Sequence, residues 1–280
     1  MAKTLYQLIR PFVPNLTLKI SHLEPHTELK VRLRQHLGLV AKGASRYESN
    51  YVKALRGIIA SGDTVFDVGA NIGFYSVLFS CWVGRAGRVV AYEPDPANVK
   101  LLELNVATNK SDNISIRKSA LGGKTGSDLF SIDTVTGSTG HLGSGPTYGE
   151  TIFGKGREQL VSVDVTTLDR EAENWGMPDL IKMDVEGGEF DVLCGGLSLL
   201  DHGRPLVVSE LSGWSDGISG SHKAAFATQL LSDHDYLLWD LDTGRRVQGG
   251  DVVWMILGVP KERAAEERIV ASVSQMKRSA

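Results

Sequence analysis

The sequence predicts an α/β fold in which helices cover both faces of one open, mostly parallel sheet. Between residues 64 and 117, short apolar runs alternate with helical patterns in the order strand, helix, strand, helix, strand. This is the order of a right-handed, doubly wound sheet. Near the C-terminus, the apolar runs 236–241 and 252–259 flank a turn and predict an antiparallel pair. A chain of 280 residues with 42% hydrophobic content can bury one such core.

Residues 1–45 precede this pattern and are predicted to form a small helical preface. One helical pattern ends at Pro11, and a second covers residues 28–39. The first sixty residues are rich in lysine and arginine. This fits a solvated helical face or, alternatively, an anionic substrate or membrane surface nearby. The preface could equally cap a pocket or form a dimer contact, so a homo-oligomer stays open.

The main domain is predicted over residues 46–260, after which a charged helical tail covers 261–280. Apolar runs bounded by turns predict its strands, and apolar residues at helical spacing predict its helices. The strands are expected at 64–68, 88–92, 113–117, 127–132, 159–165, 180–183 and 205–209, before the final pair. The helices are expected at 47–60, 72–82, 96–109, 189–200 and 222–233.

One segment of the main domain, residues 136–156, is rich in glycine, serine and threonine. It is too long for a simple connection between strands. We therefore expect it to be a flexible loop, either a lid over a binding site or a disordered segment.

The composition excludes several classes of protein. The net charge is −3 and the pI is about 6.2, so no basic surplus points to nucleic acid as a partner. No apolar run is long enough to span a bilayer, and the first residues lack the features of a signal peptide. These observations predict a cytoplasmic protein. Cys81 and Cys194 lie in apolar stretches, so we expect buried thiols rather than a disulfide.

The motif D-V-G-A-N-I-G, at residues 67–73, stands at the first strand-to-helix turn. Doubly wound sheets bind ligands at this position. Gly69 permits a sharp turn and lets a ligand lie against the backbone, while Gly73 lets the helix pack closely. A dinucleotide fingerprint reads G-x-G-x-x-G, but Asn71 and Phe74 occupy its second and third glycine positions. The turn therefore argues against a pyrophosphate and against an NAD-dependent oxidoreductase.

S-adenosylmethionine (AdoMet) has no phosphate, and its amino group and sulfonium are cationic. Asp67, at the end of the first strand, suits that charge. Glu93 ends the second strand and is placed to accept the two ribose hydroxyls of an adenosine. The two acids together predict AdoMet as the cofactor. The alternative is that they cap strand ends in an unrelated α/β protein.

Five segments, taken in order, resemble the FkbM family of class I methyltransferases. They are 67–73, Glu93-Pro94-Asp95, Ser119-Ala120-Leu121, Thr167-Leu168-Asp169 and the most family-specific, I-K-M-D-V-E-G at 181–187. The resemblance covers roughly residues 47 to 260. It implies a seven-stranded sheet whose last strand is antiparallel. It also implies O-methylation of a hydroxyl group on a natural product, a sugar or a glycolipid.

The resemblance implies which residues hold the cofactor. They are Gly69, Ala70, Asn71 and Gly73 at the methionine end, Glu93, followed by Pro94, at the ribose, Ser119 and Ala120 beside the adenine, and Glu48 closing over the cofactor. No motif of the family matches the preface or residues 136–156. The choice of acceptor is therefore expected to lie in those two segments.

Methyl transfer to an alcohol requires alignment of the acceptor and removal of its proton. Asp184 ends the fourth strand beside the expected methyl position and is the first candidate for the base. Glu186 follows on the same turn, and His141, inside the glycine-rich segment, is a further candidate. Asp184 and Glu210, at the next strand end, could instead hold a Mg²⁺ ion that binds the acceptor oxygen.

Two charged residues near these acids are interpreted as structural. Glu189 lies at a predicted helix N-terminus, where a negative charge is favourable. Lys182 lies in an apolar strand and is expected to be the buried partner of an acid, with orientation of the acceptor as the alternative.

Other hypotheses remain beside the O-methyltransferase. Methyltransferases that act on amino groups of nucleic-acid bases commonly carry Asn/Asp-Pro-Pro-Tyr after the fourth strand, where this chain reads Asp-Val-Glu-Gly. This departure argues against a nucleic-acid or other N-methyltransferase, which is the second hypothesis and is supported only by the basic preface. An NAD-dependent oxidoreductase is the third hypothesis, and a protein that binds AdoMet without catalysis is the fourth.

Overall fold

The computed structural model describes residues 13–279 apart from 15, 22–23, 45, 145, 154–158 and 212–219. The helix predicted before Pro11 lies outside the described residues.

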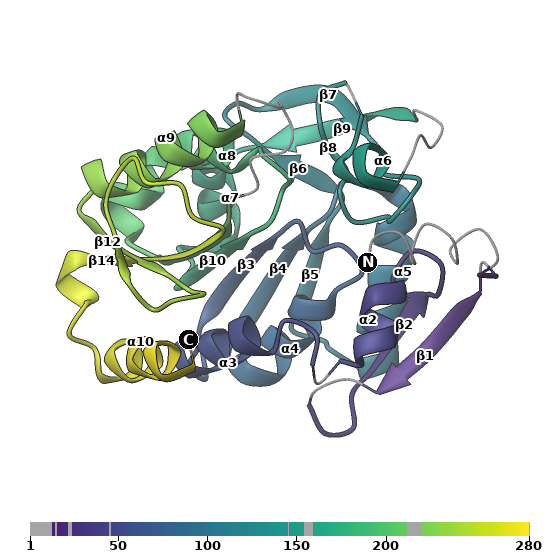
Figure 1. Cartoon of the computed structure of the whole chain (residues 1–280), viewed down its shortest axis with the longest axis horizontal. Coiled ribbons are helices and arrows are strands. Elements are labelled where there is room, and N and C mark those ends of the chain that lie inside the picture. The colour runs from purple at the N-terminus through teal and green to yellow at the C-terminus, as the bar shows by residue number, and fades with distance from the viewer. Residues whose placement is uncertain are drawn as a thin grey trace.

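The main sheet has eight strands in the order β13-β12-β14-β11-β10-β3-β4-β5 (Figure 1). They are β3 (Thr64–Val68), β4 (Arg88–Tyr92), β5 (Ile114–Arg117), β10 (Leu180–Met183), β11 (Leu206–Glu210), β12 (Tyr236–Asp240), β13 (Arg246–Val247) and β14 (Met255–Pro260). The five strands from β11 to β5 run parallel, and β14 is antiparallel to both β11 and β12. The expected seven strands are present, and the two-residue β13 extends the edge.

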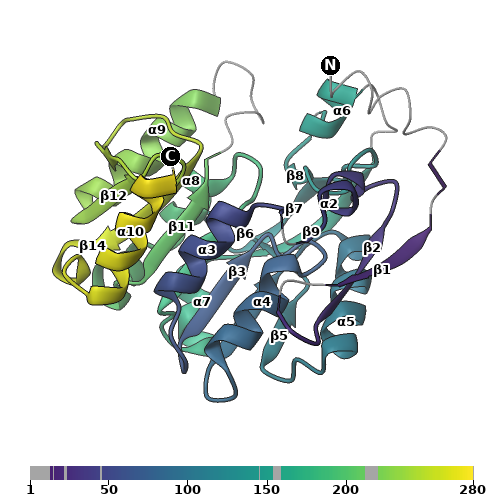
Figure 2. The same cartoon turned by 60° about the horizontal axis from the view of Figure 1, so that its bottom comes forward.

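Helices cover both faces of this sheet, as predicted (Figures 1 and 2). One face carries α3 (Ser49–Ile58), α4 (Phe74–Val83) and α10 (Glu267–Ser279), and the other carries α7 (Leu168–Trp175), α8 (Glu189–Cys194) and α9 (Gly220–Asp233). Along β3, Val65 joins the first core while Phe66 and Val68 join the second. Both faces are apolar because a strand covered on both sides presents successive side chains to opposite cores.

The remaining helices fit the predicted pattern less uniformly. The helix α5 (Pro96–Asn109) has the predicted bounds, and Asp95 caps its N-terminus by accepting from the backbone N–H groups of Ala97 and Asn98. The helix predicted at 189–200 is shorter: α8 ends at Cys194 and a π-helical turn follows at Leu199–Gly203. A short 3-10 turn (Lys261–Arg263) precedes α10.

A second, four-stranded sheet lies beside the main one, at the top of Figure 1. Its order is β6-β9-β7-β8, with β6 (Ser119–Leu121), β7 (Gly126–Ser131), β8 (His141–Leu142) and β9 (Leu160–Thr166). The strands predicted at 127–132 and 159–165 pair here in antiparallel fashion. The segment 136–156 contains β8 and the helix α6 (Tyr148–Phe153), so its described residues are folded rather than disordered.

The helical pattern predicted over residues 28–39 is wrong for its first half. There, β1 (Thr17–Ser21) and β2 (Glu28–Arg32) form an antiparallel hairpin, and only α2 (Leu37–Lys42) is helical. Leu29 and Val31 are fully buried while their neighbours are half-exposed, which is the two-residue period of a strand. Over so few residues, this period cannot be told from a helical one.

The hairpin is attached to the main domain through α5. The backbone N–H of Lys30 donates to Asn105 Oδ1 at 2.7 Å, and that of Glu28 donates to Asn109 Oδ1 at 2.8 Å. The two amide groups return donors to the carbonyls of the same two residues. The described part of the preface therefore extends the fold at the side of α5.

The C-terminal tail packs against the opposite end of the first helical layer. Ser272 on α10 donates to the carbonyl of Ala54 on α3, and Arg268 contacts Asp63 at 3.2 Å. Cys81 is exposed and Cys194 half-buried, so the expectation of two buried thiols is wrong for Cys81, which lies on the outer side of α4. Within the described ranges, no helix has the length and apolar character needed to cross a membrane.

Candidate functional site

A cavity of about 660 Å³ opens above the carboxyl ends of β3, β4, β10 and β11. The chain leaves β3 toward β4 on one side, while β10 and β11 lie on the other. Doubly wound sheets bind ligands where the strand order reverses in this way. Twelve of the fourteen residues that the sequence predicts for cofactor binding, catalysis or a metal line the cavity. They are Glu48, Gly69, Ala70, Asn71, Glu93, Pro94, Ser119, Ala120, His141, Asp184, Glu186 and Glu210.

The glycine turn has a shape that depends on its neighbours. Gly69 has φ +80°, and a Cβ there would lie 1.9 Å from the carbonyl oxygen of Asp184. Gly73 has φ +87°, and a Cβ there would lie 2.5 Å from Leu102 Cδ1 on α5. Gly73 thus permits close packing of α4 on α5. It does not line the cavity, where the family resemblance implies that it meets the methionine end of the cofactor. For Gly69, the close neighbour is the turn after β10.

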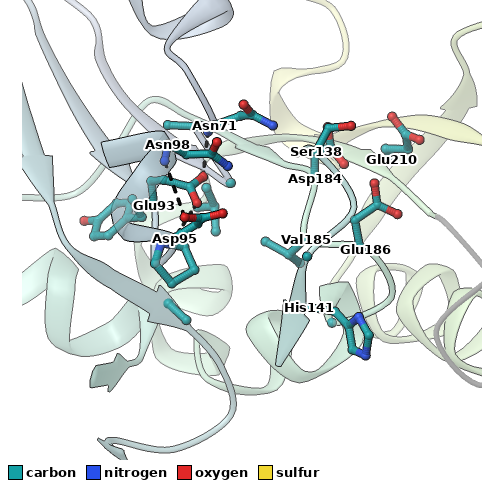
Figure 3. Close-up of a pocket in the computed structure, with 18 of the residues that line it drawn as sticks. Asn71, Glu93, Asp95, Asn98, Ser138, His141, Asp184, Val185, Glu186 and Glu210 are labelled. Carbon is teal, nitrogen blue, oxygen red and sulfur yellow. Dashed lines mark hydrogen bonds between the residues drawn. The ribbon is translucent and has the colours of Figure 1, made fainter. Parts of the chain in front are cut away.

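At one end of the cavity, Glu93 is almost fully buried and holds the glycine turn in place. Its carboxylate accepts the backbone N–H of Asn71 at 2.7 Å and that of Asp95 at 2.9 Å (Figure 3). Burial raises the pKa of Glu93 to about 7, with a further contribution from the charge of Asp95. A carboxylate can accept about four hydrogen bonds. Glu93 therefore keeps the capacity to bind hydroxyl groups in the cavity.

Two segments that the sequence did not connect meet above Glu93. The carbonyl of Gly137 accepts the side-chain amides of Asn71 at 3.3 Å and Asn98 at 3.0 Å. Arg32, from the hairpin, donates to Asn98 Oδ1. The glycine-rich segment, the preface and the nucleotide turn are thus tied together at this end of the cavity.

The preface also supplies part of the cavity wall, through residues just after β2. These residues are Gln35, His36, Gly38 and Leu39. Burial lowers the pKa of His36 to about 4, so the imidazole is neutral at physiological pH. No motif marked His36, Asn98 or Arg32 in the sequence, because only their contacts with distant segments give them a place in the site.

The glycine-rich segment folds around one buried carboxylate, that of Asp133. One oxygen accepts the N–H groups of Val135 and Thr136, and the other accepts those of Ser138 and Thr139 as well as the Thr139 hydroxyl. Burial alone would raise the pKa of Asp133, but these hydrogen bonds outweigh it and the pKa is lowered. The segment presents Ser138, His141 and their neighbours to the cavity.

Four carboxylates line the other end of the cavity. Asp184, Glu186 and Glu210 lie together, well apart from Glu93 (Figure 3), and Glu48 precedes α3, where Tyr75 donates to it. Burial, followed by the charge of Asp184, raises the pKa of Glu186 well above its usual range and that of Glu210 to about 9. Burial also raises the pKa of Glu48. These acids therefore hold protons more readily than exposed glutamates do, and a cation bound at this end would favour their ionised forms.

Lys182 lies beneath these acids. Its Nζ is 3.7 Å from Asp67 Oδ1 and 3.6 Å from Asp184 Oδ2, and it lies 5.1 Å from the centroid of the Tyr75 ring. Asp67 also accepts the hydroxyl of Ser76, and it does not line the cavity. The expectation that Asp67 meets a cofactor cation is therefore wrong: the cation that it meets is Lys182, as expected for a buried lysine paired with an acid.

Glu189 is buried below the turn that follows β10. Its Oε1 accepts the N–H groups of Val185 at 3.2 Å and Gly187 at 3.1 Å. These bonds hold a turn in which Glu186 has φ 56°. Glu189 lies in the first turn of α8, as predicted, and its carboxylate also accepts hydrogen bonds from the backbone of the preceding turn.

The predicted Mg²⁺ ligands, Asp184 and Glu210, both line the cavity. Among the residues that the structure describes, however, no three His, Cys, Asp or Glu side chains are grouped closely enough to hold a metal ion. The geometry therefore lends no support to this ligand pair.

Two curated relatives match a short part of the chain. They are the ribosomal protein L11 methyltransferases of Bacillus cereus (strain ATCC 10987 / NRS 248) and Bacillus cytotoxicus (strain DSM 22905 / CIP 110041 / 391-98 / NVH 391-98). Each is 40% identical over 63 residues, which are 22% of this chain and 20% of the relative. The chain thus spans about a fifth of the length of these relatives.

Solved structures and a family model also match the chain. Methyltransferase FkbM from Methylobacillus flagellatus KT has 20% identity and a TM-score of 0.43, covering 70% of this chain and 43% of that one. An O-methyltransferase from Bacillus cereus, in complex with SAH, has 14% identity and a TM-score of 0.47, covering 81% and 86%. The model of the methyltransferase FkbM domain matches residues 67–238, more than half of the chain. The chain therefore belongs to the FkbM methyltransferase family.

Proposed function

We propose that this chain is an AdoMet-dependent methyltransferase that acts on a hydroxyl group of a small natural product, a sugar or a glycolipid. One observation carries the proposal: a single cavity joins an acid suited to a ribose with a group of acids suited to a cation. Glu93 stands at the first end, and Asp184, Glu186 and Glu210 stand at the second. AdoMet likewise carries a ribose in one part of the molecule and a positively charged sulfonium in another.

The adenosine end fits the chemistry of the cofactor. Among the described residues, Glu93 accepts the backbone N–H groups of Asn71 and Asp95 and interacts with the Asn98 side chain. A carboxylate accepts about four hydrogen bonds, so Glu93 keeps acceptor capacity for a ribose hydroxyl. Ser119 Oγ is buried at the cavity wall and has no hydrogen-bond partner within the described residues. A buried hydroxyl without a partner is unfavourable, and a polar edge of adenine would satisfy it.

The acidic end fits a cation. Glu48, Glu186 and Glu210 all have raised pKa values because burial and neighbouring negative charge oppose their ionisation. A bound cation favours the ionised form of a nearby carboxylate. The positive groups of AdoMet would therefore offset the repulsion that these acids otherwise experience.

Bound AdoMet would supply an activated methyl group on a positively charged sulfur. The task of the chain is then to orient the acceptor and to receive its proton. Asp184, Glu186 and His141 line the same cavity and are the proposed proton acceptors. Residues of the preface and of the segment 136–144 also line the cavity, which supports a role for both in the choice of acceptor.

The turn after β3 supports AdoMet over NAD. The backbone N–H of Asn71 is bonded to Glu93, and its side chain is bonded to Gly137. A pyrophosphate requires free backbone N–H groups at this turn. At Asn71, a pyrophosphate would instead meet a backbone N–H that already donates to Glu93, together with a side chain where the fingerprint has glycine.

Calorimetric titration with AdoMet and, separately, with NAD tests the proposal. We expect AdoMet to bind and NAD to give no heat. Glu93→Ala should weaken AdoMet binding by about tenfold to a hundredfold, the range for lost hydrogen bonds to a charged group. The matched control is Glu173→Ala, which removes an exposed acid on α7 outside the cavity.

Thermal unfolding of both variants checks that Glu93→Ala retains its fold. An unmodified chain that binds no AdoMet would overturn the proposal. Heat from NAD instead would put the oxidoreductase hypothesis first. If AdoMet binds, mass-spectrometric screening of hydroxylated and amine acceptors distinguishes O-methylation from N-methylation.

A further inference from the structure

We propose that Arg32 of the preface is a positioning residue for the ribose of the cofactor: through Asn98, it fixes the direction of the Glu93 carboxylate that accepts the ribose hydroxyl groups. The inference rests on the proposed function, in which Glu93 binds that ribose. It goes further because it gives the preface, in which no motif marked a site, a part in binding the cofactor.

The first step is the fixed position of Arg32 relative to the nucleotide turn. Arg32 is the last residue of β2, and the backbone N–H of Lys30 on the same strand donates to Asn105 Oδ1 at 2.7 Å. Asn105, which is fully buried, donates in turn to the carbonyl of Ile72 at 2.7 Å. One side chain of α5 therefore joins the end of β2 to the turn that follows β3.

The second step concerns the amide group of Asn98, which is buried beside Glu93 (Figure 3). Nη2 of Arg32 donates to Asn98 Oδ1. A guanidinium has donors only, so the amide must turn its oxygen toward Arg32. The amide nitrogen is thereby left to donate to the carbonyl of Gly137 at 3.0 Å, and the Asn98 side chain also interacts with Glu93. The cation thus determines which end of a buried amide serves the acceptors at the cavity.

The third step is the effect on Glu93. Its Oε2 accepts the backbone N–H of Asn71 and its Oε1 that of Asp95, and the Asn98 side chain supplies a third interaction. These three contacts fix the plane of the carboxylate before a ligand arrives. A group that is already held in its bound direction loses less conformational freedom on binding, which raises the affinity. Arg32 therefore strengthens ribose binding without touching the ribose.

The contacts of Arg32 differ from those of an arginine that only stabilises a hairpin. Across the same hairpin, Lys19 pairs with Glu28 in an exposed ion pair, which is the ordinary contact of a surface cation. The guanidinium of Arg32 instead leaves the hairpin and bonds a buried amide of α5, and the acids whose charges act on it are Asp95 and Glu93. Its side chain is therefore directed at the ribose acid and the residue that follows it in the motif Glu93-Pro94-Asp95.

The test compares two ligands by calorimetric titration: AdoMet, and its analogue in which hydrogen replaces both ribose hydroxyl groups. Arg32→Met should weaken AdoMet binding by about tenfold, because the carboxylate that accepts the hydroxyl groups is no longer held. It should leave the affinity for the analogue unchanged, since the analogue has no hydroxyl group for Glu93 to accept. An equal loss for both ligands would reduce Arg32 to a structural residue of the preface.

Two controls separate the bond from the charge. Lys30→Met removes a positive charge from the same face of β2, two residues before Arg32, and should leave both affinities unchanged. Arg32→Lys keeps the charge and a donor, so it should recover part of the AdoMet affinity that Arg32→Met loses. A loss in Lys30→Met as large as that in Arg32→Met would show that net charge alone is responsible and would overturn the inference.

A double-mutant cycle tests the route through Asn98. If Arg32 acts on Glu93 through this amide, adding Arg32→Met to Asn98→Ala should cost no further AdoMet affinity. Losses that add in full would show that Arg32 acts by another route, and the inference would fail.

A second measurement needs no ligand. Amide hydrogen exchange followed by NMR should be faster at the N–H groups of Asn71 and Asp95 in Arg32→Met than in Lys30→Met, because both groups donate to Glu93. If Arg32→Met does not fold, Arg32→Lys gives the same comparison with a smaller effect. Unchanged exchange at both groups would overturn the inference. Absence of AdoMet binding by the unmodified chain would instead overturn the proposed function, and the exchange rates would still decide whether Arg32 holds Glu93.

Discussion

Single residues in this site owe their identity to neighbours that are remote in the sequence. Gly69 illustrates this, since its positive φ is expected of a sharp turn but its missing side chain makes room for the carbonyl of Asp184. Glu93 and Glu189 are similar cases: each is a buried carboxylate that accepts two backbone N–H groups and holds a loop of the site. The chemistry at the cavity therefore depends on residues whose first task is to fix the backbone.

At the residue scale, Gly69→Ala should lower the free energy of unfolding by more than the strain of a left-handed alanine alone would lower it. A left-handed alanine loses about 1–2 kcal/mol. At Gly69, the new Cβ would also lie 1.9 Å from a carbonyl oxygen, so the turns after β3 and β10 must separate. We expect a total loss above about 3 kcal/mol, or no folding, in urea denaturation.

The matched control is Gly62→Ala. Gly62 has φ +95°, but a Cβ there meets nothing within 4 Å. This variant reports the conformational contribution alone. Equal losses in the two variants would show that the contact with Asp184 is not a constraint.

At the scale of elements, the segment 133–144 lines part of the cavity, and its backbone is held by one acid. Asp133 accepts hydrogen bonds from four backbone N–H groups between Val135 and Thr139. The segment is in turn bonded through Gly137 to the nucleotide turn and α5. A change at Asp133 should therefore reach the adenosine end of the cavity.

Asp133→Ala should speed amide hydrogen exchange across residues 134–144 and weaken AdoMet binding by about tenfold, because the buried donors lose their acceptor. Hydrogen-exchange mass spectrometry and calorimetry measure the two effects. Asp128→Ala, an exposed change on β7 of the same sheet, serves as the control. Unchanged exchange across residues 134–144 of Asp133→Ala would contradict the role given to this carboxylate.

The elements differ in how well their patterns predicted them. The helix α5 and the strands β3, β4 and β10 have the predicted bounds, because α5 is a long periodic run and the strands are continuous apolar runs that end at clear turns. The sequence predicts a helix where β2 lies, because an alternation over five residues is too short to exclude a helix. The pairing of β7 with β9 in a sheet of their own depends on contacts that neither strand specifies by itself.

For the whole molecule, the concentration of buried acids makes stability depend on pH. Burial raises the pKa of Glu93 and Glu189 to about 7 and that of Glu210 to about 9. Between the ordinary glutamate value and these values, the folded chain binds more protons than the unfolded chain. The free energy of unfolding must then fall as the pH rises through this window.

We expect the midpoint of thermal unfolding to decrease steadily from about pH 5 to about pH 8, with each such group contributing at most about 1.4 kcal/mol per pH unit. Differential scanning calorimetry at several pH values measures it. The variant Glu210→Gln should flatten the upper part of the curve. A midpoint that stays constant or rises over this range would show that these acids titrate normally.

The sequence by itself determined the doubly wound sheet, the position of the ligand site and most of the residues at its edge. It did so because alternating strands and helices place the carboxyl ends of parallel strands along one edge, so that Gly69, Glu93 and Asp184 line the same cavity. Periodicity states which face a residue occupies, but not which partner it meets there.

Only the tertiary structure decided the partners. It turned Asp67 away from the cavity toward Lys182, placed His36 of the preface in the cavity wall, and joined Asn98 to Gly137 of the glycine-rich segment. Each of these contacts links segments that are distant in the chain. Their formation depends on how whole elements pack, since the burial of apolar faces sets the distances at which the polar groups must then find one another.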